Sequence, residues 1–119
     1  MIRTKRVYDT ADESDGFRVL VDRLWPRGVT KERAALGEWL KDAAPSAKLR
    51  KWWDHDSAKL PEFAKRYRAE LLDDPAPLEH LLELEREHRT VTLVYAARDP
   101  VMNHAQVLRD VFEERSGRR

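Results

Sequence analysis

One segment, VLVDRLWPRG at residues 19–28, constrains the fold most, because an apolar run ends abruptly in a charged, proline-containing turn. The run from Val19 to Val21 favours a pleated, buried surface, as in a core strand. Pro26 fixes its own φ and keeps Trp25 in extended backbone, so the turn is stiff. The sequence therefore predicts a core strand whose carboxyl end displays two arginines and an aspartate.

Four segments have strand character. Phe17 to Asp22 is mostly apolar, as expected inside a sheet, and Thr90 to Ala96 is the clearest buried strand. The other two are Ile2 to Val7 and a short segment from Leu36 to Leu40. The polar connection at residues 8–16 is too short for a usual helical crossover. The first two strands are therefore either antiparallel neighbours or do not pair with each other.

Capping residues and helical periodicity predict helices in much of the remaining chain. Ser46 and Asn103 suit N-caps, because a short polar side chain accepts a hydrogen bond from a free first-turn amide. Phe63, Tyr67 and Leu71 recur every four residues and form one apolar helix face. The predicted helices are a turn at 30–33, a short helix after Ser46, and helices at about 58–72, 78–85 and 103–112.

This order of elements predicts an α/β, Rossmann-like layered domain with a small, mostly parallel sheet and helices packed on it. A chain of 119 residues suits one such domain, over residues 1–112. Residues 113–119 carry little that could pack, which predicts a frayed tail.

Composition excludes several classes of function. The 23 Lys and Arg residues nearly balance the 22 Asp and Glu residues, which argues against a dedicated duplex-DNA binder but allows a local basic patch. Without cysteine there is no disulfide, thiolate metal site or cysteine nucleophile. No membrane-length apolar run or signal-peptide core is present, so we expect a cytoplasmic protein without a membrane partner. No glycine-rich phosphate loop or metal-ligand spacing is present either, so we expect no cofactor and no metal.

The first candidate site follows the strand at residues 17–22. In open α/β sheets, ligands bind outside the carboxyl ends of the strands. Arg23 and Arg27 offer planar guanidinium groups to a phosphate or carboxylate, Trp25 accompanies them, and Gly28 would allow close backbone approach. The structural alternative is that the charges pair with neighbours while Trp25 closes one end of the core.

The second candidate site follows the last strand. Free first-turn amides beside Asn103 would favour an anion, and the same helix end would favour a neutral imidazole at His104. His104 lies on the apolar face of the helix, so it should point toward the sheet. With Asp22 or Asp99 it would supply acid–base chemistry. The alternative is a histidine satisfied within the core.

A third cluster, residues 46–56 (SAKLRKWWDHD), interleaves cations with tryptophans. Such a pattern binds single-stranded nucleic acid, or else it is a core-facing aromatic stripe with a solvated back. Arg50 and His55 would complete the rim of a pocket. The side chains of Asp54, His55 and Asp56 are adjacent and do not converge on one ion, so we expect no metal there.

The ordered motifs KRVYD, VLVDRLWPRG, WLKDAAPS, LRKWWDHD, EFAKRYRAEL and TLVYAARD followed by NHA resemble the YeaO-like family of small uncharacterised bacterial proteins. The resemblance covers about residues 2–112 and implies a fold class but no activity. A broader, similar family has D-x-R-x-x-P after an early strand and C-H-R at the start of a late helix. On that resemblance Asp22, Pro26 and His104 match, whereas Asn103 stands where cysteine is usual and Ala105 where arginine is.

These observations predict a pocket between residues 22–28 and 99–104 for a small phosphate- or carboxylate-bearing molecule, nucleotide-like in its chemistry. Any catalysis would be metal-independent hydrolysis or group transfer. A protein-interaction domain with exposed tryptophans is one alternative. The other is a non-catalytic nucleic-acid module that uses Lys48, Arg50, Lys51, Arg66 and Arg68.

Overall fold

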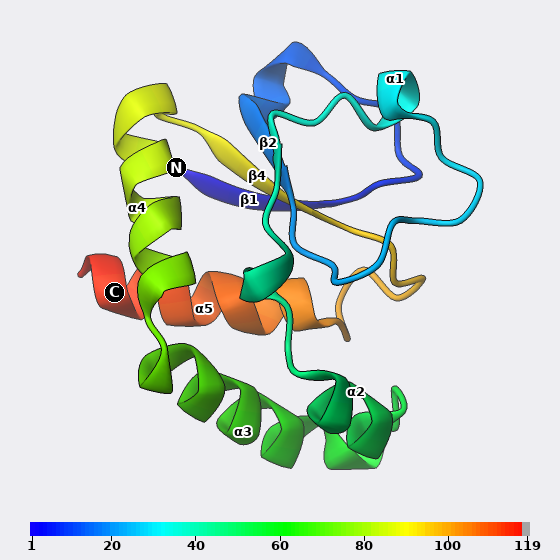
Figure 1. Ribbon diagram of the computed structural model, residues 1–119, viewed down its shortest axis with the longest axis vertical. Coiled ribbons are helices and arrows are strands. Elements are labelled where there is room, and N and C mark those ends of the chain that lie inside the picture. The colour runs from blue at the N-terminus through cyan, green and yellow to red at the C-terminus, as the bar shows by residue number, and fades with distance from the viewer. Residues whose placement is uncertain (118–119) are drawn as a thin grey trace.

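The structure, a computed structural model, describes residues 1–117 and has the predicted α/β layering (Figure 1). The strands are β1 (Ile2–Arg6), β2 (Phe17–Leu20), β3 (Glu38–Trp39) and β4 (Val91–Tyr95). The α-helices are α1 (Lys31–Ala34), α2 (Ala47–Trp53), α3 (Leu60–Asp73), α4 (Ala76–His88) and α5 (His104–Ser116). Short 3-10 helices lie at Glu13–Asp15, Lys41–Ala43 and Ser57–Lys59.

The four strands form one parallel sheet in the order β1-β4-β2-β3. The last strand along the chain, β4, lies between the first two, and Val91 is in register with both Ile2 and Phe17. Of the two possibilities for β1 and β2, the structure shows that they do not pair with each other. Because all strands are parallel, their carboxyl ends meet at one edge of the sheet.

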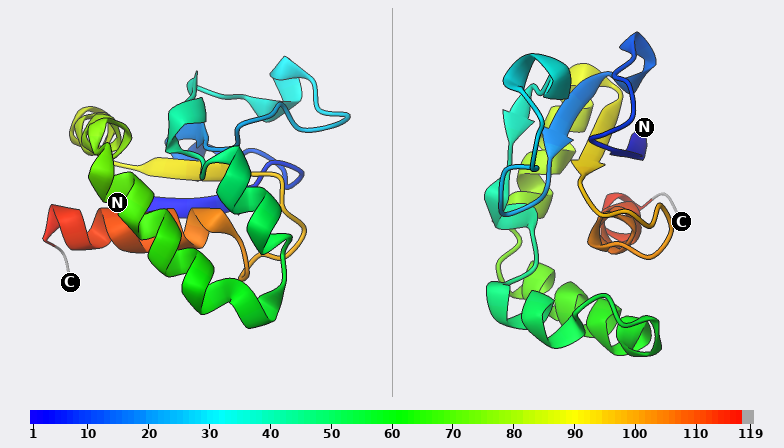
Figure 2. Two further views of the ribbon diagram at one scale, coloured as in Figure 1. Left: turned by 60° about the horizontal axis from the view of Figure 1, so that its bottom comes forward. Right: turned by 90° about the vertical axis from the view of Figure 1, so that its right-hand side faces the viewer.

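Apolar side chains alternate between the two faces of the sheet, as strand geometry requires. Val19 and Leu93 face the large core formed with the helices, whereas Leu20 and Val94 face a smaller cluster with Ala34 of α1. Figure 2 shows α4 and α5 on one side of the sheet and the thin α1 layer on the other. The chain therefore leaves β2 and β4, two adjacent strands, toward opposite faces.

Helix α5 packs on β1 and β4, and α3 packs on α5 (Figure 1). The predicted apolar face of α3 is confirmed, because Phe63 and Tyr67 are fully buried and Leu71 is nearly so. Helix α5 continues through Ser116, so residues 113–116 of the predicted frayed tail are helical. Residues 118 and 119, the end of that tail, lie outside the described residues.

A buried charge cluster lies near the amino ends of the strands, and sequence reasoning did not identify it. Arg18 of β2 is only 4% exposed, and it pairs with Asp15 at 2.6 Å while its Nε donates to the Ala34 carbonyl. Burial by itself raises the pKa of Asp15. The Asp12 amide and the side chains of Lys5 and Arg18 outweigh burial and hold this pKa below its usual value of 3.8.

Among the described residues, no helix combines the length and the apolar character needed to cross a membrane.

Candidate functional site

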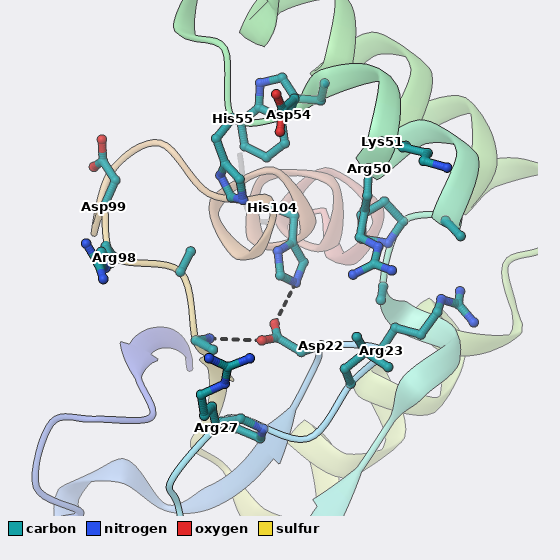
Figure 3. Close-up of a pocket in the computed structure, with 18 of the residues that line it drawn as sticks. Asp22, Arg23, Arg27, Arg50, Lys51, Asp54, His55, Arg98, Asp99 and His104 are labelled. Carbon is teal, nitrogen blue, oxygen red and sulfur yellow. Dashed lines mark hydrogen bonds and ion pairs between the residues drawn. The ribbon is translucent and has the colours of Figure 1, made fainter.

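A cavity of about 980 Å³ opens at the carboxyl edge of the sheet, outside β2 and β4 (Figure 3). Its walls come from the loop after β2, the end of α2 with the residues that follow it, and the loop between β4 and α5. Adjacent strands whose connections leave toward opposite faces create a crevice of this kind, and α/β proteins bind ligands there. The pocket thus lies between the two strand ends that the sequence indicates.

Asp22 and His104 form the floor of the cavity. One carboxylate oxygen of Asp22 accepts from the Ala96 amide at 3.0 Å, and the other lies 3.1 Å from His104 Nε2. The same Nε2 lies 3.1 Å from the Val21 carbonyl oxygen. Since both neighbours of Nε2 are acceptors, this nitrogen carries the proton and donates it to Val21; its approach to Asp22 is a close polar contact rather than a hydrogen bond. Asp22 therefore joins the end of β2 to the end of β4 and to the start of α5.

Aromatic side chains hold the turn after β2. The Trp25 indole donates to the Val29 carbonyl at 2.7 Å, and the Trp39 indole donates to the Asp22 carbonyl at 2.7 Å. The two indole rings also meet edge to face. The Tyr8 hydroxyl donates to the Arg27 carbonyl at 2.9 Å. The backbone of the turn is thus held by residues of β3 and of the segment after β1, which fixes the positions from which Arg23 and Arg27 extend.

Helix α2 forms the opposite wall, and α3 determines its position. Ser46 caps α2 as predicted, since its hydroxyl accepts from the Leu49 amide at 3.1 Å. Glu70 of α3 accepts from both the amide and the hydroxyl of Ser46, at 2.9 and 2.6 Å. Trp53 stacks on Phe63 with ring centroids 4.0 Å apart. These contacts present Arg50 to the cavity.

Two consecutive residues after α2, Asp54 and His55, have left-handed backbone, with φ of 47° and 54°. Non-glycine residues rarely adopt this conformation in succession. It turns the chain back over the cavity, where His55 lies against Trp53 with ring centroids 4.7 Å apart. Figure 3 shows His55 on the far side of the cavity from Asp22.

The loop from β4 to α5 is shaped by its own side chains. Asp99 accepts from the amides of Val101 and Met102 at 2.8 and 3.0 Å, and these bonds hold its pKa below the usual value. Asn103 caps α5 as predicted, by accepting from the Gln106 amide at 3.1 Å. One of the first-turn amides that the sequence suggested for anion binding, that of Gln106, is therefore already bonded to Asn103.

Positive charge dominates the cavity. It is lined by five cationic side chains and three carboxylates, of which Asp22 and Asp99 already bond to backbone amides. Within the part of the chain that the structure describes, none of the five cations has a hydrogen bond or ion pair to a carboxylate, and the Nε atoms of two, Arg23 and Arg50, are buried without a partner. The five are Arg23, Arg27, Arg50, Lys51 and Arg98.

Eight of the ten site residues predicted from the sequence line the cavity. These are Asp22, Arg23, Trp25, Arg27, Arg50, His55, Asp99 and His104. Gly28 and Asn103 do not line the cavity: Gly28 serves the turn through its φ of 75°, and Asn103 is buried at 1% exposure. Their assignment to ligand contact is therefore not supported by their positions.

Sequence reasoning gave no role in the pocket to Tyr8, Lys51 or Arg98, which also line it. Tyr8 and Arg98 follow β1 and β4, and so both lie at the carboxyl edge. Their position directly after a predicted strand was the signal that could have identified them as pocket residues. Lys51 adjoins Arg50 on α2, but the sequence does not show which α2 side chains face the sheet edge.

The tryptophans and two of the cations do not have the exposed, unpaired positions that a protein interface or a nucleic-acid site would use. None of the four tryptophans is exposed, so the predicted surface of exposed tryptophans is absent from the structure. The guanidinium carbon of Arg66 lies over the Trp52 ring, 4.2 Å from the ring centroid. Arg66 also pairs with Glu62. Arg68 pairs with Glu114. Two of the five cations proposed to contact nucleic acid are thus paired within the chain.

Comparison with known proteins places this chain among relatives of similar length. It is 43% identical to "Uncharacterized protein YeaO" of Escherichia coli (strain K12) over 92% of this chain and 94% of that protein. It is 44% identical to "Uncharacterized protein Rv3073c" of Mycobacterium tuberculosis (strain H37Rv) over 96% of this chain and 95% of that protein. No solved structure matches the chain significantly. Residues 1–119 match the family DUF488-N3i, described as "Inactive DUF488-N3 subclade", and the chain therefore belongs to that family.

Proposed function

We propose that this protein binds a small organic anion in the cavity between the loop after β2, the end of α2 and the loop before α5. The observation that carries the proposal is the set of five cations that line one cavity and pair with no carboxylate among the described residues. Gathering like charges without counter-charges is unfavourable, and a bound anion would compensate them.

The remaining lining of the cavity suits an organic body on the anion. Pro26, Trp53 and Met102 contribute apolar surface between the charged groups. A volume of about 980 Å³ lies at the upper end of the range of small-molecule sites. Phosphate and carboxylate groups match guanidinium geometry, so a phosphorylated or carboxylated metabolite, including a nucleotide, fits this lining.

The family description favours binding of the anion without a chemical reaction. The family is described as inactive, and Asn103 stands where a similar family has cysteine. His104 Nε2 is bonded to the Val21 carbonyl and lies 3.1 Å from Asp22, which makes these groups a fixed floor that recognises a ligand rather than a free acid. We also propose that the protein is cytoplasmic.

Native mass spectrometry of the purified protein, followed by thermal unfolding with phosphorylated and carboxylated metabolites, tests the proposal. A ligand at 100 times its Kd adds about 2.7 kcal/mol, which corresponds to roughly 10 °C for a chain of this size. The shift should be largely lost in Arg50→Ala. It should persist in Arg66→Ala, a matched control that removes the same charge from outside the cavity.

The two variants also decide where any binding occurs. Equal losses in Arg50→Ala and Arg66→Ala would refute the cavity as the site. Strongly salt-dependent binding of an oligonucleotide, weakened in both variants, would instead support the nucleic-acid alternative.

A further inference from the structure

We infer that the ligand of this cavity carries anionic groups at two separated ends, as a sugar bisphosphate does. This inference rests on the proposed function and specifies its ligand class. It follows from how the five cations and Asp22 are distributed over the cavity (Figure 3).

One group of cations, the α2-side group, consists of Arg23, Arg50 and Lys51. Arg50 and Lys51 belong to α2, and Figure 3 shows Arg23 on the same side of Asp22 and His104 as these two residues. The Nε atoms of Arg23 and Arg50 are both buried without hydrogen-bond partners.

The second group, the β1-side group, consists of Arg27 and Arg98. The backbone of Arg27 is held by Tyr8, which follows β1, and the carbonyl just before Arg98, that of Ala97, accepts from Arg6 of β1 at 2.8 Å. β1 is one edge of the sheet, two strands away from β2. Figure 3 shows Arg98 and Arg27 on the opposite side of Asp22 and His104 from Arg50 and Lys51.

Asp22 lies between the two groups, and its carboxylate accepts from the Ala96 amide and lies 3.1 Å from His104 Nε2, with no bond to any of the five cations among the described residues. A fixed negative charge at the middle of the floor repels an anion placed there. It does not repel an uncharged hydroxyl, which donates to a carboxylate. The favoured ligand therefore has a neutral, hydroxyl-bearing centre over the floor and one anionic group toward each group of cations.

Two matched pairs of compounds test this arrangement by calorimetric titration at constant ionic strength. Fructose 1,6-bisphosphate differs from fructose 6-phosphate by a second phosphate at the far end of the molecule. Pyrophosphate differs from phosphate by a second phosphate next to the first, and so controls for added charge alone. We expect the remote phosphate to improve affinity about tenfold or more, as for added charge-assisted hydrogen bonds, and the adjacent phosphate to improve it less.

Variants identify the two ends. Arg98→Ala should remove most of the gain in affinity from fructose 6-phosphate to fructose 1,6-bisphosphate, because it takes a cation from one of the two ends. Arg50→Ala should weaken both sugar phosphates, and Arg66→Ala neither. If both sugar phosphates bind equally and remain sensitive to Arg50→Ala, the two-ended inference is overturned while the proposed function stands. If none of the four compounds binds, both are overturned.

Discussion

Replacing Asp22 by asparagine should destabilise the fold, although the two side chains have nearly the same shape. The two carboxylate oxygens of Asp22 face two donors, the Ala96 amide at 3.0 Å and His104 Nε2 at 3.1 Å. Asparagine has one acceptor oxygen, and its NH2 group would face whichever donor the oxygen does not reach. If the asparagine oxygen keeps the Ala96 bond, its NH2 group faces the protonated Nε2 of His104, donor against donor; in the other orientation the Ala96 amide loses its acceptor.

The size of the effect follows from the burial of the site. Leaving a buried donor unsatisfied costs about 1–3 kcal/mol. The side chains of Asp22 and His104 are 17% and 12% exposed, so cavity water compensates in part. We therefore expect a loss of about 1–2 kcal/mol in the free energy of unfolding, which is roughly 4–8 °C in Tm for a domain of this size.

Urea unfolding, followed by tryptophan fluorescence, measures this loss as a lower midpoint at an unchanged m-value. Asp54→Asn is the matched control. It removes a carboxylate from the same cavity, has no hydrogen bond from its side chain among the described residues, and retains a residue type that tolerates left-handed backbone. Asp54→Asn should stay within about 0.5 kcal/mol of the parent. Equal midpoints for the two variants would refute the assigned role of Asp22.

The remaining predictions concern the stability of the scaffold. Asp15→Asn leaves Arg18 without its counter-charge at 4% exposure, and urea unfolding at pH 7 should show a loss of about 3–5 kcal/mol; a loss below 1 kcal/mol would contradict the buried pair. Because the native pKa of Asp15 lies below 3.8, its stabilisation is present above that pH and is lost as the pH falls through the native pKa. Acid unfolding of Asp15→Asn should lack this component, and an unchanged acid slope would contradict it. Gly16→Ala places a Cβ 2.4 Å from the Thr90 carbonyl oxygen, whereas the Cβ of Gly28→Ala meets nothing within 4 Å. Thermal unfolding should therefore show a stability loss of about 1–2 kcal/mol for Gly28→Ala and a larger loss for Gly16→Ala. Similar losses in the two variants would argue against this steric explanation.

The local elements were predictable because their signals are local. The apolar run of β4 and the four-residue recurrence on α3 each require a particular secondary structure, whatever the rest of the chain does. The position of the cavity was also predictable, because Asp22 and His104 each adjoin the carboxyl end of a core strand and parallel strands bring such ends together.

Strand order was not predictable in the same way. β4 lies between β1 and β2 through contacts between residues some seventy or more positions apart, and no local pattern encodes that pairing. The direction of a side chain is equally non-local. Arg18 interrupts an apolar strand yet is buried, because Asp15, three residues earlier, folds back to pair with it. Asn103 and Gly28 carry good signals for a cap and a turn, and the structure shows those roles rather than contact with the cavity.

A small organic anion in the cavity at the carboxyl edge of the sheet should perturb the backbone amides that surround it. Backbone amide chemical shifts, recorded by NMR during a titration with fructose 1,6-bisphosphate, test it most directly. We expect saturable shifts concentrated in residues 22–28, 50–55 and 96–99, and their loss in Arg50→Ala. Saturable shifts centred on the outer face of α3 around Arg66, or no saturable shifts at all, would contradict it.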